Sequence, residues 1–303
     1  MTKDGSKRDT TFDRLLTPKQ VAQSLQVSEA SVKRWCDKGI IAAQYTEGGH
    51  RRISVTRLLD YVRSSGRHLV HPELLGLPAS LGQAGRQLDG LVEPLVTALI
   101  EGDEQQSRRL VLDLYLAEHA LSSLCDRVLT RAFEIVGERW ECGLTEVYQE
   151  RRACEIMLRV LHELRLMVPP LPTDAPLALG GVVEGDSYQL ATTMVELVLR
   201  DARWNAVSLG NNLPLETLAA ALKTHRPRLF WLSCSRLVDE AEFLRGYRAL
   251  YDEFGMDIAF VVGGRALTEP VRREMRYAAY CDNLQHLESF AQALRGSIRT
   301  PEI

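Results

Sequence analysis

The sequence of 303 residues lacks long hydrophobic runs and an apolar signal core. No apolar run reaches the roughly 18 residues that a membrane-spanning helix needs, and the first ten residues, MTKDGSKRDT, are polar. We therefore expect no membrane partner and a cytoplasmic location. With 45% hydrophobic and 25% charged residues, the composition also excludes collagen-like, disordered and disulfide-scaffold classes.

Cysteine pairs and catalytic motifs are absent as well. The six cysteines are dispersed, and none forms a Cys-x-x-Cys pair, which argues against a structural zinc site and a disulfide framework. We find no nucleophile–base constellation. We therefore expect that the protein is not an enzyme and has no catalytic residues, and we assign no certain metal ligand.

Charge is distributed unevenly. The net charge is −3, yet residues 1–72 contain more Lys and Arg than Asp and Glu, and the rest of the chain is acidic. A small basic module on a larger acidic body indicates an acidic partner, with nucleic acid the first candidate.

Residues 17–39 have the pattern of two short helices separated by a brief break. Thr17 can cap a helix that starts at Pro18, the helical position that proline prefers. This helix fails near Gln26–Val27, and Ser28 can cap a second helix that stops at Gly39. Two such helices form a helix-turn-helix, whose second helix can enter the major groove or grip phosphates. The side chains of this helix that we expect to contact DNA are Ser31, Lys33, Arg34 and Lys38.

A hairpin follows, with basic residues on its second strand. We expect Gly48 and Gly49 to supply positive φ angles for a tight turn. Such a wing can lie along a phosphate backbone or reach into a minor groove. The wing residues that we expect to contact DNA are Tyr45, His50, Arg51 and Arg52.

Residues 15–63 resemble the DNA-binding head of the MerR and excisionase-like regulators. The resemblance rests on the Trp-x-x-x-Gly element at 35–39 and the Gly-Gly-His-Arg-Arg element at 48–52. It implies a winged helix-turn-helix whose partner is double-stranded promoter DNA.

The rest of the chain has a helical part and a part in which strands and helices alternate. Apolar residues at helical spacing between about 78 and 167 predict four helices in an antiparallel bundle. Beyond the Pro-rich boundary at 168–176, five βα units with apolar strands predict a doubly wound parallel, flavodoxin-like five-stranded sheet. The expected fold is thus multidomain α and α/β. Its parts are a disordered tail (1–14), the winged helix-turn-helix head (15–66), a linker (67–76), a four-helix bundle (77–168) and an α/β domain (175–303).

Within the α/β part, the pattern predicts apolar strands at 177–183, 206–210, 229–235 and 258–264 and a short segment at 280–283. Helices are expected at 190–201, 214–225, 239–253, 269–278 and 286–295. Doubly wound sheets bind ligands at the carboxyl ends of their strands. The loops at 184–189, 233–237 and 263–266 are therefore the candidate ligand loops.

These loops lack the motifs of two common ligand classes and contain those of a third. Glu-Gly-Asp-Ser-Tyr replaces a dinucleotide-binding Gly-x-Gly-x-x-Gly, and Ser-Cys-Ser replaces the aspartate of a phosphoacceptor receiver. The loops do resemble the cobalamin-binding domain, whose signature is Asp-x-His-x-x-Gly, then Ser-x-Leu, then Gly-Gly. Asp186, Tyr188 and Ala191 stand in the first element; 41 residues then precede Ser233 and Ser235, and 27 more precede Gly263-Gly264, as in that family.

Head, bundle and sheet together resemble the light-sensing, cobalamin-dependent MerR-type repressors of carotenoid genes. In that family a Trp, and ten residues later a Glu followed by His, cover the upper face of adenosylcobalamin; Trp140 and Glu150 match this spacing. Glu141 and Arg151 replace two family histidines, and Tyr188 replaces the lower-ligand His. The cofactor site that the resemblance implies is Trp140, Glu150, Asp186, Tyr188, Ser233, Ser235, Gly263 and Gly264.

The missing histidines leave three options for the ligand. Imidazole is a good cobalt donor, whereas a tyrosine hydroxyl with a pKa of about 10 is a poor one. Cobalamin can bind without a protein lower ligand, haem or another tetrapyrrole can bind through Tyr188 or a nearby Cys or His, or the domain can be ligand-free.

We expect a DNA-binding transcriptional regulator, a repressor, whose oligomerisation and promoter binding are set by the bundle and the cobalamin-type domain. A single head contacts too few phosphates for tight binding, so we expect a homodimer or homotetramer on repeated half-sites. The family resemblance adds a photoreceptor role. The alternatives are a corrinoid-dependent enzyme or methyl carrier and a ligand-free oligomeric DNA-binding protein.

Overall fold

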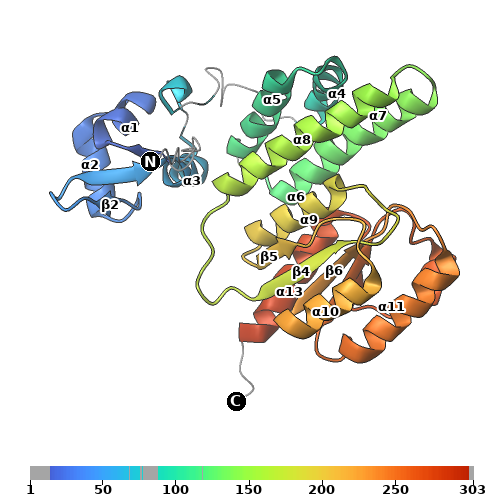
Figure 1. Ribbon diagram of the computed structural model, residues 1–303. Helices are drawn as coiled ribbons and strands as arrows, with labels where there is room; N and C mark the ends of the chain where they lie inside the picture. The colour runs from blue at the N-terminus through green and yellow to red at the C-terminus, as the bar shows by residue number, and fades with distance from the viewer. Residues whose placement is uncertain (1–13, 68, 76, 78–87, 118, 300–303) are drawn as a thin grey trace, which may run out of the picture. The chain divides into compact units, whose positions relative to one another are not determined.

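The computed structural model describes residues 14–67, 69–75, 77, 88–117 and 119–299 (Figure 1). The chain forms two compact units. The first is made of Met1–Ala120 and Ala132–Pro169, and the second of Leu121–Arg131 and Pro170–Ile303. The tail that we predict to be disordered lies outside the described residues apart from Arg14. No helix in the described part of the chain has both the length and the hydropathy of a membrane span.

The first unit starts with a winged helix-turn-helix, as predicted. Its elements are β1 (Leu15–Leu16), α1 (Pro18–Ser24), α2 (Glu29–Asp37), β2 (Gln44–Tyr45), β3 (Arg51–Ser54) and α3 (Val55–Ser65). The strands form an antiparallel sheet in the order β1-β3-β2. Val21, Val32 and Leu58, one from each helix, are fully buried and form part of the core of this head.

Side-chain caps start both helices of the helix-turn-helix at the predicted residues. Thr17 Oγ1 accepts a hydrogen bond from the Gln20 backbone N–H at 3.3 Å, and the Gln20 side chain accepts one from the Thr17 N–H at 2.9 Å. This capping box precedes Pro18, the first helical residue. Ser28 Oγ accepts a hydrogen bond from the backbone N–H three residues later at 3.1 Å. Between the helices the chain turns at Gln26, which has a φ of 53°.

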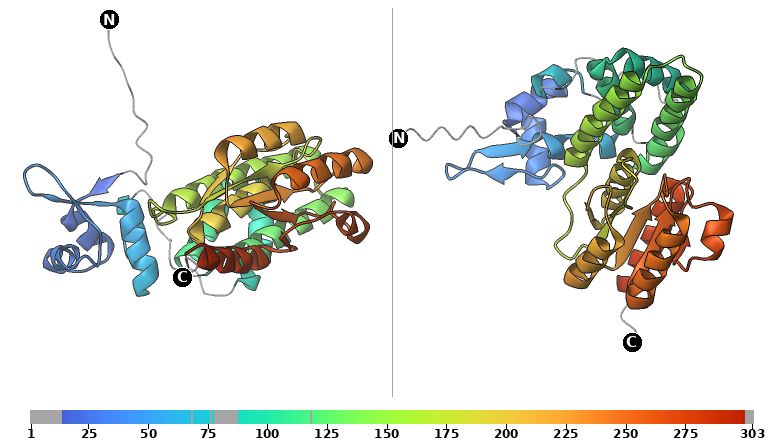
Figure 2. Two further views of the ribbon diagram at one scale, coloured as in Figure 1. Left: turned by 90° about the horizontal axis from the view of Figure 1, so that it is seen from below. Right: turned by 45° about the vertical axis from the view of Figure 1, so that its right-hand side comes forward.

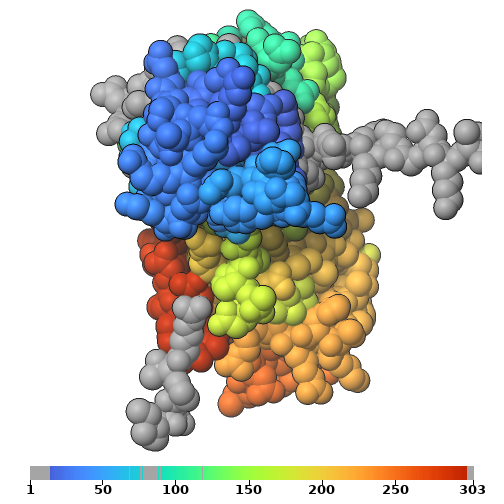
Figure 3. Space-filling model, turned by 90° about the vertical axis from the view of Figure 1, so that its left-hand side faces the viewer, coloured from blue at the N-terminus to red at the C-terminus, as the bar shows by residue number. Residues whose placement is uncertain are grey.

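The β2–β3 hairpin, the wing, extends beyond the helices of the head (Figure 2), and the surface of the head is shown in Figure 3 with the wing in lighter blue. The Gly49 N–H closes the turn with a 2.8 Å hydrogen bond to the Thr46 carbonyl. Gly49 has a φ of 74°, but Gly48 has no positive φ. The expectation that both glycines are left-handed was therefore wrong, because one left-handed residue suffices to reverse a chain in a turn of this length.

The segment that we expected to be a linker contains a 3₁₀ turn, η1 (Pro72–Leu75). The backbone N–H groups of Val70 and His71 both donate to the Ser24 carbonyl, at 2.8 and 3.2 Å. Leu75 and Leu77 are buried. The described residues of this segment thus pack against α1 and do not form an extended linker.

Residues 92–167 form four helical segments, as predicted. They are α4 (Val92–Glu101) after a short η2 (Asp89–Leu91), α5 (Glu104–Leu116), the run α6 (Leu121–Leu124), π-helical η3 (Cys125–Thr130) and α7 (Arg131–Glu141), and α8 (Val147–Met167). Within the first unit, α4, α5 and α8 contact one another. Residues 121–131, which we expected to share one domain with the rest of the bundle, belong to the second unit.

Two hydrogen bonds and a cation–π contact connect α3 of the head to the helices of the first unit. Thr56 Oγ1 donates to the Leu166 carbonyl at 3.2 Å, and Arg63 Nη2 donates to the His119 carbonyl at 3.1 Å. The guanidinium of Arg63 also lies 4.3 Å from the centre of the Tyr115 ring. Helix α3 therefore belongs structurally to both the head and the helical part of this unit.

The second unit is a doubly wound parallel sheet, as predicted. Its elements are β4 (Leu177–Val182), α9 (Leu190–Asp201), β5 (Asn205–Ser208), α10 (Leu215–His225), β6 (Leu229–Ser233), α11 (Glu240–Phe254), β7 (Ala259–Gly263), α12 (Glu269–Arg273), β8 (Ala279–Tyr280) and α13 (Leu284–Arg299). The strand order is β5-β4-β6-β7-β8. Helix α12 ends at Arg273 rather than at the predicted 278, because the Ala278 N–H already pairs with the Phe260 carbonyl at 2.8 Å to begin β8.

Different helices pack on the two faces of this sheet (Figure 1). Strand side chains alternate between the faces. On one face, Phe230 and Phe260 belong to a buried cluster with side chains of α10 and α11. On the other face, Trp231 donates to Thr192 of α9 at 3.0 Å, and Trp204 donates to the Ala291 carbonyl of α13 at 3.1 Å. Because the chain winds in opposite directions on either side of β4 and β6, the carboxyl ends of these two strands form the switch point.

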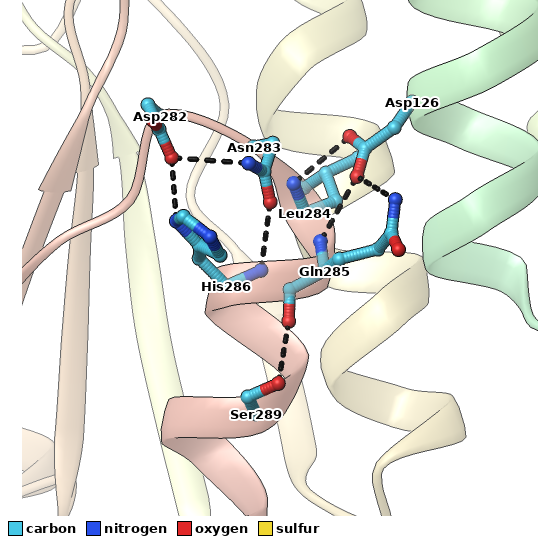
Figure 4. A network of polar contacts seen from close by, with 7 residues as sticks. All are labelled: Asp126, Asp282, Asn283, Leu284, Gln285, His286 and Ser289. Carbon is cyan, nitrogen blue, oxygen red and sulfur yellow. Dashed lines mark hydrogen bonds and ion pairs between the residues drawn. The ribbon is translucent and has the colours of Figure 1, made fainter.

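Asp126 of η3 caps the N-terminus of α13 (Figure 4). Its carboxylate accepts hydrogen bonds from the backbone N–H groups of Leu284 and Gln285 at 2.9 and 3.0 Å and from Gln285 Nε2 at 3.2 Å. The first amides of a helix have no partner within it, and the helix dipole favours a negative charge there. This capping explains why residues 121–131 pack with the second unit, although they are far from it in sequence.

We predict that Asp126→Ala destabilises the docked α13 by about 1 kcal/mol, because two helix N–H groups lose their acceptor. Hydrogen exchange of a peptide that starts at Leu284 should become faster in this variant. Asp126→Asn is the matched control, because it keeps one acceptor oxygen, and it should show a smaller effect. Unchanged exchange in Asp126→Ala would show that the cap is not needed.

Candidate functional site

Helix α2 and its C-cap residue carry three exposed cations. Lys33, Arg34 and Lys38 are all exposed, and Lys33 Nζ lies 2.8 Å from Glu29 Oε1 one turn earlier. Ser31, the fourth predicted contact, is half-buried, and its hydroxyl lies 2.9 Å from Ser28 Oγ. Ser31 thus takes part in the helix cap, whereas the three long cations are available to a polyanion.

Arg51 is bound to the end of α2. Its Nη2 and Nε atoms lie 2.6 and 3.0 Å from Asp37 Oδ1, and Asp37 is the last residue of that helix. The guanidinium lies 5.7 Å from the centre of the Tyr45 ring on the paired strand. The hydrogen bond to Asp37 raises the pKa of Arg51 above its usual value. Arg51 therefore connects the wing to the end of α2.

Arg52 differs from its neighbour. It pairs with Gln44 across the hairpin, and strand alternation places it on the face opposite Arg51 and Ile53. Its Nη1 donates to the Arg51 carbonyl at 3.2 Å, and among the described residues it forms no ion pair with a carboxylate. His50 is exposed where the chain leaves the turn. Arg52 and His50 are thus the wing side chains with capacity for an external anion.

The α7–α8 turn of the first unit exposes apolar side chains. Trp140 is 47% exposed at the end of α7. Glu150 is half-buried, accepts a hydrogen bond from Cys154 Sγ at 3.4 Å and lies 3.4 Å from Arg151 Nε. The exposed apolar residues around this turn, the α7–α8 patch, are Trp140, Leu144, Val147 and Tyr148.

Asp186 organises the carboxyl edge of the sheet in the second unit. The residue is only 2% exposed. Oδ1 accepts a hydrogen bond from the Tyr188 N–H at 2.9 Å, and Oδ2 accepts from the N–H groups of Ser235 and Arg236 at 2.5 and 3.1 Å. The carboxylate therefore ties the loop after β4 to the loop after β6.

The loop after β7 meets the same edge. The Cys234 N–H donates to the Gly263 carbonyl at 2.9 Å, and the Ala266 N–H donates to the Cys234 carbonyl at 3.0 Å. Gly264 has a φ of 107°, and a methyl group there would overlap the backbone of Cys234. Ser233 is 6% exposed beside this contact. The three predicted loops thus lie together, and Gly264 must be glycine for them to approach so closely.

The predicted residues fall in both units. Trp140 and Glu150 are in the first, and Asp186, Tyr188, Ser233, Ser235, Gly263 and Gly264 are in the second. Sequence reasoning missed Trp231, which lies two residues before Ser233 on the same face of β6, and Thr192, its hydrogen-bond partner. Two signals were available: the strand alternation itself, and the Gly180-Gly181 pair inside a buried strand, since interior glycines mark a close approach.

Thiols near the sheet edge are poor candidates for metal ligands. Burial raises the pKa of the Cys234 thiol, and it raises that of Cys281 to about 11. In the α7–α8 region, burial and the nearby Glu150 raise the pKa of Cys154 to about 12. A thiol must lose its proton to bind a metal. Across the described ranges, no group of three or more His, Cys, Asp or Glu side chains is placed to hold a metal ion.

Comparisons with known families identify two domains. A helix-turn-helix domain family matches residues 15–66, and a B12 binding domain family matches residues 91–165. These matches confirm the predicted helix-turn-helix and the presence of a B12-binding domain, but the B12 match lies on the helices at 91–165 and not on the α/β part at 175–303, where we placed the cobalamin-binding domain. The B12 match covers the helices that carry Trp140 and Glu150.

Two of the proteins that this chain resembles are corrinoid proteins. The chain is 21% identical over 245 residues to the methanol–corrinoid protein of Methanosarcina barkeri (strain Fusaro / DSM 804). This alignment covers 78% of this chain and 93% of that protein. The solved structure of the Methanosarcina barkeri monomethylamine corrinoid protein is 17% identical, covers 69% of this chain and 100% of that chain, and gives a TM-score of 0.59. At this identity the structural likeness shows the fold alone, and it confirms the predicted one.

The residues at the edge of the sheet do not fit a corrinoid that takes its lower cobalt ligand from the protein. Tyr188 stands where the resemblance places the lower-ligand histidine, and a phenol is a poorer donor to cobalt than an imidazole. Asp186, which could otherwise orient a ligand, already accepts three backbone N–H groups. We therefore derive no step through a bond between cobalt and the protein.

We predict that Gly264→Ala destabilises the second unit by roughly 1–3 kcal/mol, because it adds a methyl group at a left-handed φ and against backbone. Urea denaturation should show a lower midpoint. Gly137→Ala in α7 is the control, since a Cβ there meets no atom within 4 Å, and the helix should become slightly more stable. Equal midpoints for Gly264→Ala and the natural protein would contradict the close contact.

Proposed function

We propose that this protein is a DNA-binding transcriptional regulator that acts as a repressor. The observation that carries the proposal is the head, in which Lys33 and Arg34 of α2 and Lys38 at its C-cap are exposed beside a wing that carries His50 and Arg52. The helix-turn-helix family match to the same residues supports it. Recognition helices of this kind lie in the major groove, with the wing against the backbone or the minor groove.

The head is preorganised for this binding. The Asp37–Arg51 contact joins the end of α2 to the wing, so helix and wing meet the duplex as one surface. Lys33 exchanges its contact with Glu29 for a phosphate on binding, and Arg52 has no carboxylate to give up among the described residues. Phosphate contacts supply affinity, and base contacts from α2 supply specificity.

A single head makes few phosphate contacts, so we propose that the protein binds repeated half-sites as a homodimer or homotetramer. Joining two heads raises their effective concentration and turns two weak contacts into tight binding. The helical and α/β parts then set how many heads are joined. They connect to DNA binding through α3, which contacts both the head and the helices of its unit.

We propose a corrinoid as the ligand class of this body. The B12 domain match and the printed name of the 21% identical relative support it. The α7–α8 patch fits a flat macrocycle, because Trp140 offers an exposed aromatic face for stacking. The ligand would be held through its ring, since the protein offers no imidazole at position 188. For the same reason, light-driven exchange of a cobalt ligand for a histidine is not part of the proposal.

A second candidate function is that of a corrinoid methyl carrier. The similarity to the methanol–corrinoid protein over most of the chain favours it. The carrier function gives no role to the exposed cations of α2 or to the wing. In addition, position 188 of the protein offers no histidine to bind the cobalt of a carrier. The test below separates the candidates, since a carrier has no need to retain DNA.

We predict that Arg52→Ala weakens binding of the full-length protein to all duplexes and lowers the slope of log K against log salt by about 0.9 for each head bound. Fluorescence anisotropy with a promoter fragment and an unrelated fragment at several salt concentrations measures both effects. Arg245→Ala removes the same charge from an exposed site on α11 and should leave binding unchanged. If the natural protein binds no duplex even at low salt, the proposal that it is a DNA-binding regulator is wrong.

A further inference from the structure

Trp231 fills the α9-covered face of the sheet near its carboxyl edge. The residue is 2% exposed, and its indole N–H donates to Thr192 Oγ1 of α9 at 3.0 Å. Thr192 is itself fully buried, and its hydroxyl lies 3.4 Å from Ser208 Oγ at the end of β5. The indole is therefore held by packing and by a buried hydrogen bond.

The neighbouring strand is shaped to receive the indole. Gly180 of β4 lies directly opposite Trp231 in the register of the sheet. A methyl group on Gly180 would overlap the indole ring and the Trp231 carbonyl. On the next residue, Gly181, it would come within 2.8 Å of the Gly210 carbonyl and of a Leu213 methyl group. The absence of a side chain at Gly180 makes the volume that the indole occupies, whereas Gly181 faces the other side of the sheet.

This volume adjoins two residues that the family resemblance places in the cofactor site, Ser233 and Gly263. Ser233 follows Trp231 by two residues and so shares its face, and it pairs in register with Gly263. The serine hydroxyls and the paired glycines of that site leave a slot in which the backbone can approach a long nucleotide tail closely. A tail that entered past Ser233 and Gly263, between the sheet and α9, would meet the indole.

We propose that Trp231 takes the place of the nucleotide tail, so that this protein excludes tail insertion and recognises a corrinoid through its ring alone. The proposal rests on the corrinoid as ligand class. It makes Trp231 a specificity-determining residue: corrinoids with and without a nucleotide tail bind alike. It also agrees with Tyr188, because a corrinoid whose tail stays outside the protein can keep its own base on cobalt.

The test compares two probes, hydroxocobalamin and cobinamide, which has no nucleotide tail. Full-length natural protein, Trp231→Phe and Trp231→Ala are titrated with each, and absorption spectra report both affinity and whether the base stays on cobalt. Trp231→Phe is the matched control, because it keeps an aromatic ring beside Gly180 and lacks the indole N–H that donates to Thr192. Circular dichroism verifies that each variant is folded, and Trp231→Leu replaces Trp231→Ala if the latter does not fold.

We expect the natural protein and Trp231→Phe to make no distinction between the probes, and Trp231→Ala to prefer cobalamin by at least about tenfold, which corresponds to about 1.4 kcal/mol. A natural protein that binds neither probe overturns recognition through the ring, whether or not the opened variant gains cobalamin. A natural protein that prefers cobalamin tenfold, with its base displaced, overturns it. Absence of cobalamin binding by a folded, opened variant overturns it too. DNA retention is measured separately on the same preparations, so failure of the regulator assignment remains distinguishable.

Discussion

The contact between the indole of Trp231 and the bare backbone of Gly180 constrains what the second unit can do. A large side chain in the middle of β6 is possible only because the adjacent strand has no Cβ at the register position opposite it. The same contact fills the α9-covered face beside the switch point, where parallel sheets bind ligands. The second unit thus has a fold that a solved corrinoid protein shares, and the side chain of Trp231 occupies the interior beside its switch point.

The loops around that edge are held by backbone contacts rather than by chemistry directed at a ligand. The Asp186 carboxylate accepts hydrogen bonds from three backbone N–H groups in two loops. Gly264 allows the third loop to lie against Cys234. Residues of a ligand-binding motif, such as Asp186 and Gly264, can therefore serve to hold the loops in place. The head shows a parallel division of roles, since adjacent arginines on one strand face opposite ways, and one braces the wing through Asp37 while the other is open to an anion.

Much of the fold was predictable because its signals are local. Thr17, Pro18 and Ser28 start helices through contacts within three or four residues, and the apolar strands of the second unit are separated by amphipathic helices. The prediction for α12 overran, because its end depends on the pairing of Ala278 with Phe260, which is distant in sequence. The capping of α13 by Asp126 could not be predicted at all, since 158 residues separate Asp126 from Leu284.

The sequence by itself determined the basic winged head, the order of strands and helices, and the meeting of three loops at one edge of the sheet. Periodicity, caps and charge are properties of short windows, and the topology of a parallel sheet follows from them. Only the tertiary structure decided which arginine braces the wing and that Trp231 fills the space over Gly180. The role of each arginine and the contact of Trp231 with Gly180 depend on which residues of two paired strands lie opposite each other on the same face. This register is set by packing across the whole sheet.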